Sequence, residues 1–348
     1  MLVSFMFSTT LVFFGIVYGD CMDNPIIKVD NVMKKYNVNE SISKKGFLNK
    51  FRRKKVTKIA LNGVSLKVQK GSIVALLGKN GSGKSTLIKI MTGIIYPDKG
   101  EIFVDGFIPY IDRKKLALEM GVVLGAHGQL FWNLPAIDTF NFMRSMYKIP
   151  EAEFQKRLKL YIKMFSLKDV YKKPVRTMSL GEQMKCNFVS SMLHNPKIVF
   201  LDEPTIGVDL PSKMALKEAI LKARDTLGTT FLLTTHIIED IEIADNVIII
   251  NKGKKEFDGT KKELEHIFGE NRIVDIFCSS SSNLDYGRYG KVLSRKGNMI
   301  RMEVKPHILK NKNFIMMLNN KNVLDYRVSE PHLSYILSKI YESFDKKR

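Results

Sequence analysis

Residues 72–86, SIVALLGKNGSGKST, constrain the fold of this chain more than any other stretch. The apolar run 72–78 predicts a buried strand, and residues 84–93 predict a helix that starts directly after a glycine-rich turn. Together they match the pattern G-x-x-x-x-G-K-[ST], in which glycines let successive backbone N–H groups wrap a phosphate. Lys84 is then placed to reach the β- and γ-phosphates of a nucleotide, and the Ser85 hydroxyl is placed to bind Mg²⁺.

The chain continues this alternation of strands and helices to about residue 269. Further strands are predicted at 197–203, 229–236 and 246–253, and further helices at 151–165, 181–194 and 212–226. Most of these strands are nearly continuous apolar runs, which is typical of parallel strands buried on both faces. The mainly helical segment 150–174 predicts a helical insert in an α/β domain with a largely parallel sheet.

Two acidic residues and a histidine end neighbouring strands of this predicted sheet. Asp202 and Glu203 end the strand KIVFLDE, and His236 ends the next one. Ligands bind beyond the carboxyl ends of the strands in open α/β sheets, so these side chains are expected near the phosphate loop. Asp202 can hold Mg²⁺ through water, and Glu203 can polarise an attacking water. A lone histidine at a strand end is more often structural, but beside these carboxylates we assign His236 to catalysis.

The composition is that of a globular protein with a strongly basic charge balance. The 348 residues are 45% hydrophobic and 26% charged, which excludes a disordered chain. The formal net charge of +21 indicates contact with a nucleotide, a nucleic acid or an acidic membrane face, or else a lysine-rich surface without a dedicated partner. The three cysteines have no paired spacing, which excludes a disulfide framework and a zinc pattern and fits a reducing cytosol.

Two segments raise the question of membrane contact. Residues 1–21 begin with nineteen uncharged residues, for which three origins stay open: a mis-assigned start upstream of Met22, a membrane anchor, or a cleaved signal. Residues 42–58 carry eight lysines or arginines and no acid. They form either a solvated surface loop or a basic segment near acidic lipid headgroups.

The composition changes after Gly269. Short β-like runs and a closing helix over 331–344 predict a small α+β tail at 270–348, without a cluster of residues that indicates chemistry. The expected organisation is therefore the apolar segment 1–21, an α/β domain at 22–269, and this tail.

In their order along residues 26–265, these motifs resemble the ATP-binding subunit of an ABC transporter. The resemblance implies a P-loop NTPase fold of the ABC type, ATP and Mg²⁺ as ligands, and ATP hydrolysis as the reaction. It places an aromatic ring on adenine at Tyr36, and His236 matches the switch histidine of the family. The remaining ATP-binding residues that it implies are Gly78, Lys79, Asn80, Gly81, Ser82, Gly83, Lys84, Ser85 and Thr86.

A second motif, MSLGEQ at residues 178–183, stands where the family keeps its L-S-G-G-Q signature. In the family this signature faces the ATP bound to a second subunit. The resemblance therefore implies that Ser179 and Gly181, with Asp209 in the D-loop-like GVD, complete the ATP site of a partner. ATP would join two subunits, a homodimer, head to tail about a two-fold axis. Ser179 also stands where the N-cap of the predicted helix is expected.

Two departures from the family pattern concern these contact regions. Leu180 and Glu182 replace a glycine and the glutamine of the signature, and a carboxylate near a triphosphate is expected to weaken closure slightly. The family also keeps a glutamine near Ala126, where it senses Mg²⁺ and contacts the membrane subunit. The nearest candidate here is Gln129, three residues later. Either Gln129 is a re-registered metal contact or that contact is absent.

The sequence segments QLFWNLP, SLGEQMK and FLDEPTIGVDL are most similar to those of bacterial exporter ATPases that pair with separate six-helix permeases. The implied function is an ATPase subunit, peripheral on the cytoplasmic face of the cell membrane, that drives export through permease chains and has no nucleic acid partner. One alternative is a soluble ABC ATPase acting on nucleic acid or ribosomes, but the sequence lacks the second ATP domain, coiled-coil insertion or zinc cysteines usual there. The other is a module that dimerises on ATP and hydrolyses it poorly, which Ala126 and Glu182 favour and Glu203 and His236 oppose.

Overall fold

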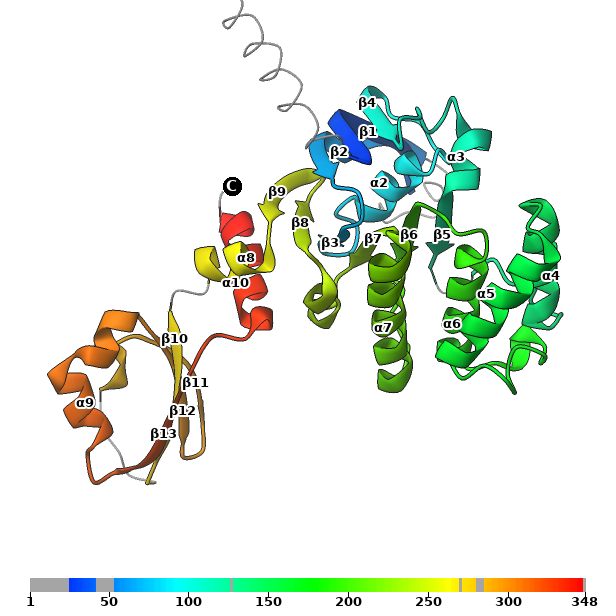
Figure 1. Ribbon diagram of the computed structural model, residues 1–348. Helices are drawn as coiled ribbons and strands as arrows, with labels where there is room; N and C mark the ends of the chain where they lie inside the picture. The colour runs from blue at the N-terminus through cyan, green and yellow to red at the C-terminus, as the bar shows by residue number, and fades with distance from the viewer. Residues whose placement is uncertain (1–24, 42–52, 126–127, 269–270, 280–284, 347–348) are drawn as a thin grey trace, which may run out of the picture. The chain divides into compact units, whose positions relative to one another are not determined.

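The computed structural model describes residues 25–41, 53–125, 128–268, 271–279 and 285–346, which form two compact units (Figure 1). The units divide between Asp258 and Gly259, ahead of the boundary expected at residue 270. The difference arises because helix α8 (Lys261–Phe268) contacts helix α10 (Leu333–Lys346) of the second unit. The apolar segment 1–21 and residue Ala126 lie outside the described residues. Within those residues, no helix combines the length and the apolar character that crossing a membrane requires.

A six-stranded sheet forms the centre of the first unit. Its strand order is β5 (Met120–Leu124), β6 (Ile198–Asp202), β7 (Thr230–Thr235), β3 (Ile73–Leu77), β8 (Asn246–Asn251) and β9 (Lys254–Gly259). The pairings from β5 through to β8 are all parallel. β3 and β7 are buried at every residue, and this is why their sequences are unbroken apolar or small-polar runs. The expected mainly parallel sheet is confirmed.

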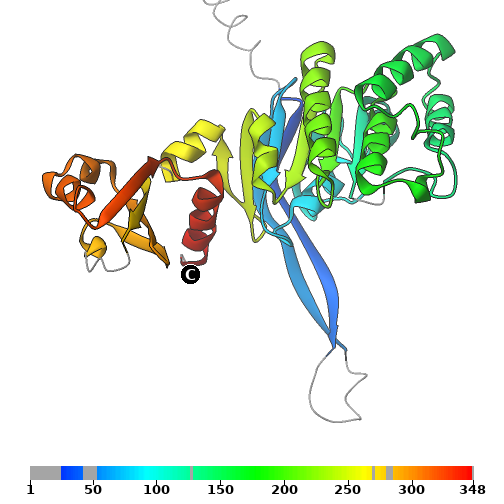
Figure 2. The ribbon, with the colours of Figure 1, turned by 90° about the horizontal axis from the view of Figure 1, so that it is seen from below.

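Helices surround this sheet, and the expected helical insert is found among them. They are α2 (Lys84–Met91), α3 (Arg113–Glu119), α4 (Ala136–Met146), α5 (Glu151–Met164), α6 (Leu180–Met192) and α7 (Leu210–Leu227), with short 3₁₀ turns η2 (Val175–Thr177) and η3 (Ile238–Ile243). In both views α4 and α5 lie beyond the edge strand β5 (Figures 1 and 2). The helices predicted from the sequence are found within a few residues of their expected ends.

A second, antiparallel sheet completes the first unit, in the order β2 (Arg53–Val68), β1 (Ile27–Ser41) and β4 (Lys99–Val104). β1 and β2 form a long hairpin whose register runs out to Ser41 opposite Arg53 (Figure 2). The basic segment 42–58 was expected to be one loop or amphipathic segment. Its last part, from Arg53 onward, is instead strand, because it pairs with β1; residues 42–52 lie outside the described residues.

The second unit is a small α+β fold. Its antiparallel sheet has the order β11 (Lys291–Lys296), β12 (Met299–Val304), β10 (Arg272–Cys278) and β13 (Val323–Ser329). Helix α9 (Lys312–Leu318) and the turns η4 (Tyr286–Arg288) and η5 (Pro306–Lys310) accompany it, and Phe314 and Tyr286 are fully buried in its apolar core. α10 reaches β12 through Tyr335, whose hydroxyl donates to Glu303 Oε2 at 2.9 Å.

Candidate functional site

The turn between β3 and α2 leaves the start of α2 open. Its N-cap is Gly83, which has φ +116° and makes no side-chain capping hydrogen bond. A Cβ at this position would lie 2.6 Å from the Ala60 carbonyl oxygen, so only glycine fits. The first N–H groups of a helix have no partners within the helix and favour an anion. The local fold therefore offers these groups to a phosphate.

Lys84 places a buried cation at this opening. Its side chain is 3% exposed, and its Nζ donates to the Gly78 carbonyl at 2.7 Å and lies 3.6 Å from Glu203 Oε1. Burial lowers the pKa of Lys84, and the Glu203 and Asp202 carboxylates oppose that shift. A phosphate beside the ammonium would stabilise its charged form, which burial disfavours.

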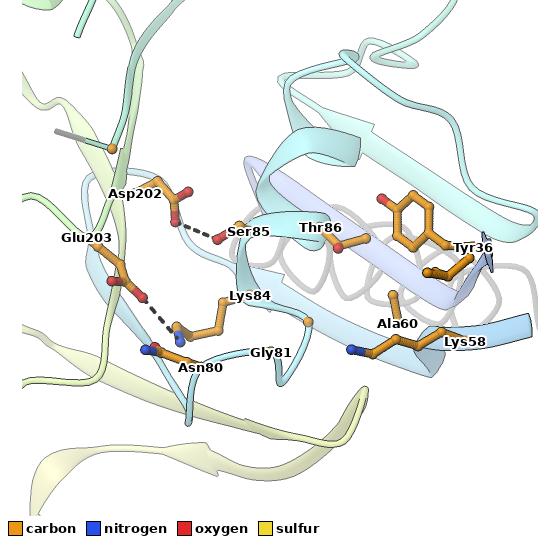
Figure 3. A pocket seen from close by; sticks show the side chains of 13 residues that line it. Tyr36, Lys58, Ala60, Asn80, Gly81, Lys84, Ser85, Thr86, Asp202 and Glu203 are labelled. Carbon is orange, nitrogen blue, oxygen red and sulfur yellow. Dashed lines mark hydrogen bonds and ion pairs between the residues drawn. The ribbon is translucent and has the colours of Figure 1, made fainter. Parts of the chain in front are cut away.

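Ser85 and Asp202 form an oxygen-lined corner beside Lys84. The Ser85 hydroxyl donates to Asp202 Oδ1 at 3.1 Å (Figure 3). The Thr234 hydroxyl donates to the same oxygen at 2.5 Å. Hydroxyl and carboxylate oxygens are the ligands that Mg²⁺ takes, usually beside waters and substrate phosphates. The two residues fit a magnesium ion in chemistry and in position.

Glu203 is held in a strained backbone conformation next to this corner. Its φ is +52°, in the left-handed region, which costs a side-chain-bearing residue about 1–3 kcal/mol. Its N–H donates to both the carbonyl and the hydroxyl of Thr234, at 3.1 and 3.0 Å, and these bonds fix the strained turn. The carboxylate lies between Lys84 and His236, whose Nδ1 is 3.5 Å from Glu203 Oε2. The structure thus brings Lys84, Glu203 and His236 together.

A cavity of about 550 Å³ extends from Lys84, Asp202 and Glu203 to the β1–β2 hairpin (Figure 3). Tyr36 and Lys58 lie on the side of the cavity away from Asp202 and Glu203. Sequence reasoning missed Lys58, although it pairs with Tyr36 in the hairpin register. The lining residues are Tyr36, Val38, Lys58, Ala60, Asn80, Gly81, Gly83, Lys84, Ser85, Thr86, Gly125, Asp202 and Glu203.

A buried acid ties together the two loops that carry Glu203 and His236. Asp240 Oδ2 accepts hydrogen bonds from the hydroxyls of Thr205 at 2.6 Å and Thr235 at 2.7 Å, and the residue is 3% exposed. Thr205 follows Glu203 by two residues, and Thr235 directly precedes His236. Sequence reasoning missed Asp240, whose only signal is an acid within the turn that follows the histidine.

The signature-like segment forms the start of α6. The Ser179 N–H donates to Glu182 Oε2 at 2.8 Å, and the Glu182 N–H donates to Ser179 Oγ at 3.2 Å, which makes a capping box. A Cβ on Gly181 would lie 2.4 Å from Asp209 Oδ2, so the structure packs these two predicted contact residues together. Hydrogen bonds from Ser212 lower the pKa of Asp209. Among the described residues, Ser179, Gly181 and Asp209 are not part of the cavity wall of their own chain.

Gln129 is not brought to the metal corner. Its Nε2 donates to the Val122 carbonyl at 2.6 Å, and its N–H donates to Asn187 Oδ1 at 3.0 Å. Among the residues of this loop that the structure describes, Gly125 reaches the cavity wall. The Mg²⁺ contact considered for Gln129 has no support from this geometry.

Comparisons with known proteins agree with the geometry. The sequence pattern of a family described as ABC transporter matches residues 61–206. The ABC transporter ATP-binding protein NatA of Bacillus subtilis is 30% identical over 225 residues, which cover 64% of this chain and 89% of NatA. The linearmycin resistance ATP-binding protein LnrL of the same species is 30% identical over 223 residues, 64% of this chain and 71% of LnrL.

Solved structures share the fold. That of cbiO1 from Clostridium perfringens, part of the ABC transporter complex cbiONQ, matches with a TM-score of 0.57 and 26% identity, over 70% of this chain and 92% of that one. The phosphate loop and the Asp–Glu pair line one cavity, and His236 lies 3.5 Å from Glu203. The two relatives above each cover 64% of this chain. The chain belongs to the family of ABC transporter ATP-binding proteins, the ATP-hydrolysing subunits of these transporters.

Proposed function

We propose that this chain works as a head-to-tail homodimer on the cytoplasmic face of a membrane and drives export through separate permease chains. One observation carries the proposal. A single chain gathers Lys84, Ser85, Asp202 and Glu203 at one cavity, while its signature residues Ser179 and Gly181 lie outside the wall of that cavity. A second copy supplies the missing contacts if the two chains meet about a two-fold axis, because each copy then gives what the other needs.

The residues have distinct tasks in hydrolysis. Bound Mg²⁺, held by Ser85 and Asp202, would neutralise charge on the phosphates. Phosphate oxygens compete with Glu203 for the Lys84 ammonium, since the two side chains are only 3.6 Å apart. Glu203 is then free to orient water and accept its proton, and His236 contacts the carboxylate from its other side.

A group of exposed apolar side chains supports a membrane partner. Five large side chains on and just before α4 are 37–56% exposed, namely Phe131, Trp132, Leu134, Phe142 and Met146. The rings of Phe131 and Phe142 lie 5.4 Å apart and pack edge to face. Exposed apolar patches of this kind mark sites of protein association. NatA and LnrL, an ABC transporter protein and a resistance protein by name, favour transport and an outward direction.

The first experiment replaces the proposed base. Glu203→Gln keeps size and shape and removes the charge that orients water, so hydrolysis should fall at least about a hundredfold. ATP binding should persist, and native mass spectrometry should show an ATP-dependent dimer that accumulates because it is not consumed. Near-normal turnover of this variant would exclude Glu203 as the base.

A second experiment tests the membrane partner. A photoreactive amino acid at Trp132 is cross-linked in cells, with the same group at Leu227, at the end of α7, as a matched exposed control. We expect position 132, but not 227, to label a polytopic membrane chain. Labelling of ribosomal or nucleic-acid-binding proteins instead would favour the soluble alternative.

A further inference from the structure

Strand β13 is an edge strand with unusual exposure. It ends the sheet of the second unit, and its five central residues are all exposed. Three of them are large apolar side chains: Leu324 is 69% exposed, Tyr326 43% and Val328 42%. An exposed apolar edge offers its unpaired backbone groups to another strand.

The backbone of β13 indicates which residues face outward. The Tyr326 N–H donates to the Asp325 carboxylate at 2.7 Å. Its register partner on β10 is Ile276, two residues from Cys278, whose N–H donates to Asn298 on the β12 side, so Tyr326 is at a position that faces away from β10. Because N–H groups alternate in direction along a strand, those of Leu324 and Val328 face the same free edge. The Asp325 carboxylate thus accepts a hydrogen bond from the Tyr326 N–H, a group that would donate to a second strand if one paired with this edge.

The sequence of β13 is complementary to itself. When two copies pair antiparallel about Tyr326, Leu324 faces Val328 and Asp325 faces Arg327, each twice. Outward N–H groups put Tyr326 and the Leu324–Val328 pairs at hydrogen-bonded positions. The Asp325–Arg327 pairs then take the non-hydrogen-bonded positions, where side chains approach most closely.

A row of alternating charge leads to this edge. Asp275 on β10 holds Arg301 of β12 through two hydrogen bonds, at 2.6 and 2.8 Å, and its register partner on β13 is Arg327. Arg301, Asp275 and Arg327 therefore alternate in sign across the sheet. An Asp325 from a second copy would continue the row beyond Arg327.

The opposite edge lacks this property. β11 carries Lys291, Arg295 and Lys296, and no acid, so two copies of it would repel each other. Lysines on edge strands are a known protection against pairing. Of the two edges, only β13 combines apolar exposure with charges that match their own copy.

We propose that two copies of this chain join their second units by pairing β13 with β13 about a two-fold axis at Tyr326. The occupant of the edge is thus another copy of the chain, and the contact requires no nucleotide. It gives an eight-stranded sheet across the dimer, with hydrogen bonds, two apolar pairs and two ion pairs related by symmetry.

Disulfide cross-linking of the full chain tests this register. The variant is Tyr326→Cys with Cys21→Ser; Cys186 and Cys278 are buried and stay. Directly opposed hydrogen-bonded residues have Cα atoms about 5.5 Å apart, which suits a disulfide. We expect most of the chain to form a cross-linked dimer under mild oxidation without nucleotide, also when Lys84→Ala is added to prevent ATP-driven dimers.

The matched control is Ser329→Cys on the same strand. In the proposed register two copies of Ser329 lie roughly 20 Å apart, so this variant should not cross-link to itself. It should cross-link instead to a separate chain that carries Val323→Cys, its facing residue. Equal cross-linking of Tyr326→Cys and Ser329→Cys would overturn the proposal.

Charge reversal gives a second readout in the Tyr326→Cys chain. Arg327→Asp places like charges opposite one another at two places, and the cross-linking rate should fall about tenfold. Adding Asp325→Arg to that chain restores opposite charges and should restore the rate. A cross-linking rate that stays the same in both variants would contradict pairing in this register.

Discussion

Two helix starts in the first unit carry the sequence motifs, and they are built in opposite ways. α2 begins after Gly83 without a side-chain cap, so its N–H groups have no local side-chain acceptor. α6 begins with the Ser179–Glu182 capping box, which satisfies N–H groups within the chain. The start of α2 depends on a ligand, whereas the start of α6 is complete before any ligand arrives.

This difference defines what each end can do. The α2 start is suited to bind phosphate, because it offers backbone N–H groups beside the buried Lys84. Ser179 Oγ accepts a hydrogen bond from Glu182, but the hydroxyl proton is not used in that bond and can be donated outward. The preformed α6 start is suited to a second, rigid contact that closes on a nucleotide already bound elsewhere.

Mixing two inactive variants gives the largest expected effect. Lys84→Ala removes a charge-assisted contact worth roughly 1.5–3 kcal/mol per hydrogen bond, and Ser179→Arg fills the space that the partner's phosphate must enter. Each homodimer should be inactive, because both of its sites lack one essential group. In a mixed dimer one site has both lesions and the other has none. With random pairing, ATPase activity should return to about a quarter of wild type.

The control for this experiment is a mixture of wild type with Lys84→Ala, whose mixed dimer also keeps one intact site. With random pairing, its wild-type homodimers alone give about a quarter of wild-type activity, and activity of about a half shows that a single intact site turns over. If native mass spectrometry detects mixed Lys84→Ala and Ser179→Arg dimers that stay inactive while this control reaches about a half, Ser179 does not serve its neighbour.

The hydrogen bonds from Thr205 and Thr235 to the buried Asp240 act as a clamp between two loops. Weakening this Asp240 clamp should have an intermediate effect on kcat. Thr205→Val removes one of its two hydroxyl donors, so the loops that hold Glu203 and His236 lose a restraint. A lost hydrogen bond to a charged group costs about 1.5–3 kcal/mol, and we expect kcat to fall roughly tenfold or more. The KM for ATP should change little, because Lys84 and Tyr36 are unaffected. Thr205→Ser keeps the hydroxyl and should retain kcat; equal losses in both variants would show that the clamp has no catalytic role.

Much of the first unit could be predicted because its physics is local. Apolar runs such as residues 73–77 specify buried strands, and the glycine turn before Lys84 allows few other folds. The meeting of Asp202, Glu203 and the phosphate loop follows from the parallel topology, since they follow the carboxyl ends of β6 and β3, which flank β7 and run parallel to it.

The rest depends on contacts between distant segments. Lys58 reaches the cavity only through the register of the β1–β2 hairpin, and Asp240 acts through hydroxyls on two other segments. The charge row of β13 exists only once β10 and β12 are placed beside it. No single stretch of sequence contains these relations, so pattern reading could not find them.

The smallest effect is expected at Glu182, which the sequence suggested would weaken closure. Its carboxylate accepts the Ser179 N–H, and glutamine can do the same, so Glu182→Gln should keep the capping box. Removing the charge should lower the ATP concentration for half-maximal activity by about twofold. This change corresponds to an interaction free energy of about 0.3–1 kcal/mol for a surface charge at a helix start. Glu182→Ala is the matched variant, which loses the acceptor and should reduce the free energy of unfolding by about 1 kcal/mol. If the glutamine variant needs more ATP than wild type, the Glu182 carboxylate assists the ATP site of the partner. Glu182 would then serve both the capping box of α6 and the function of the dimer.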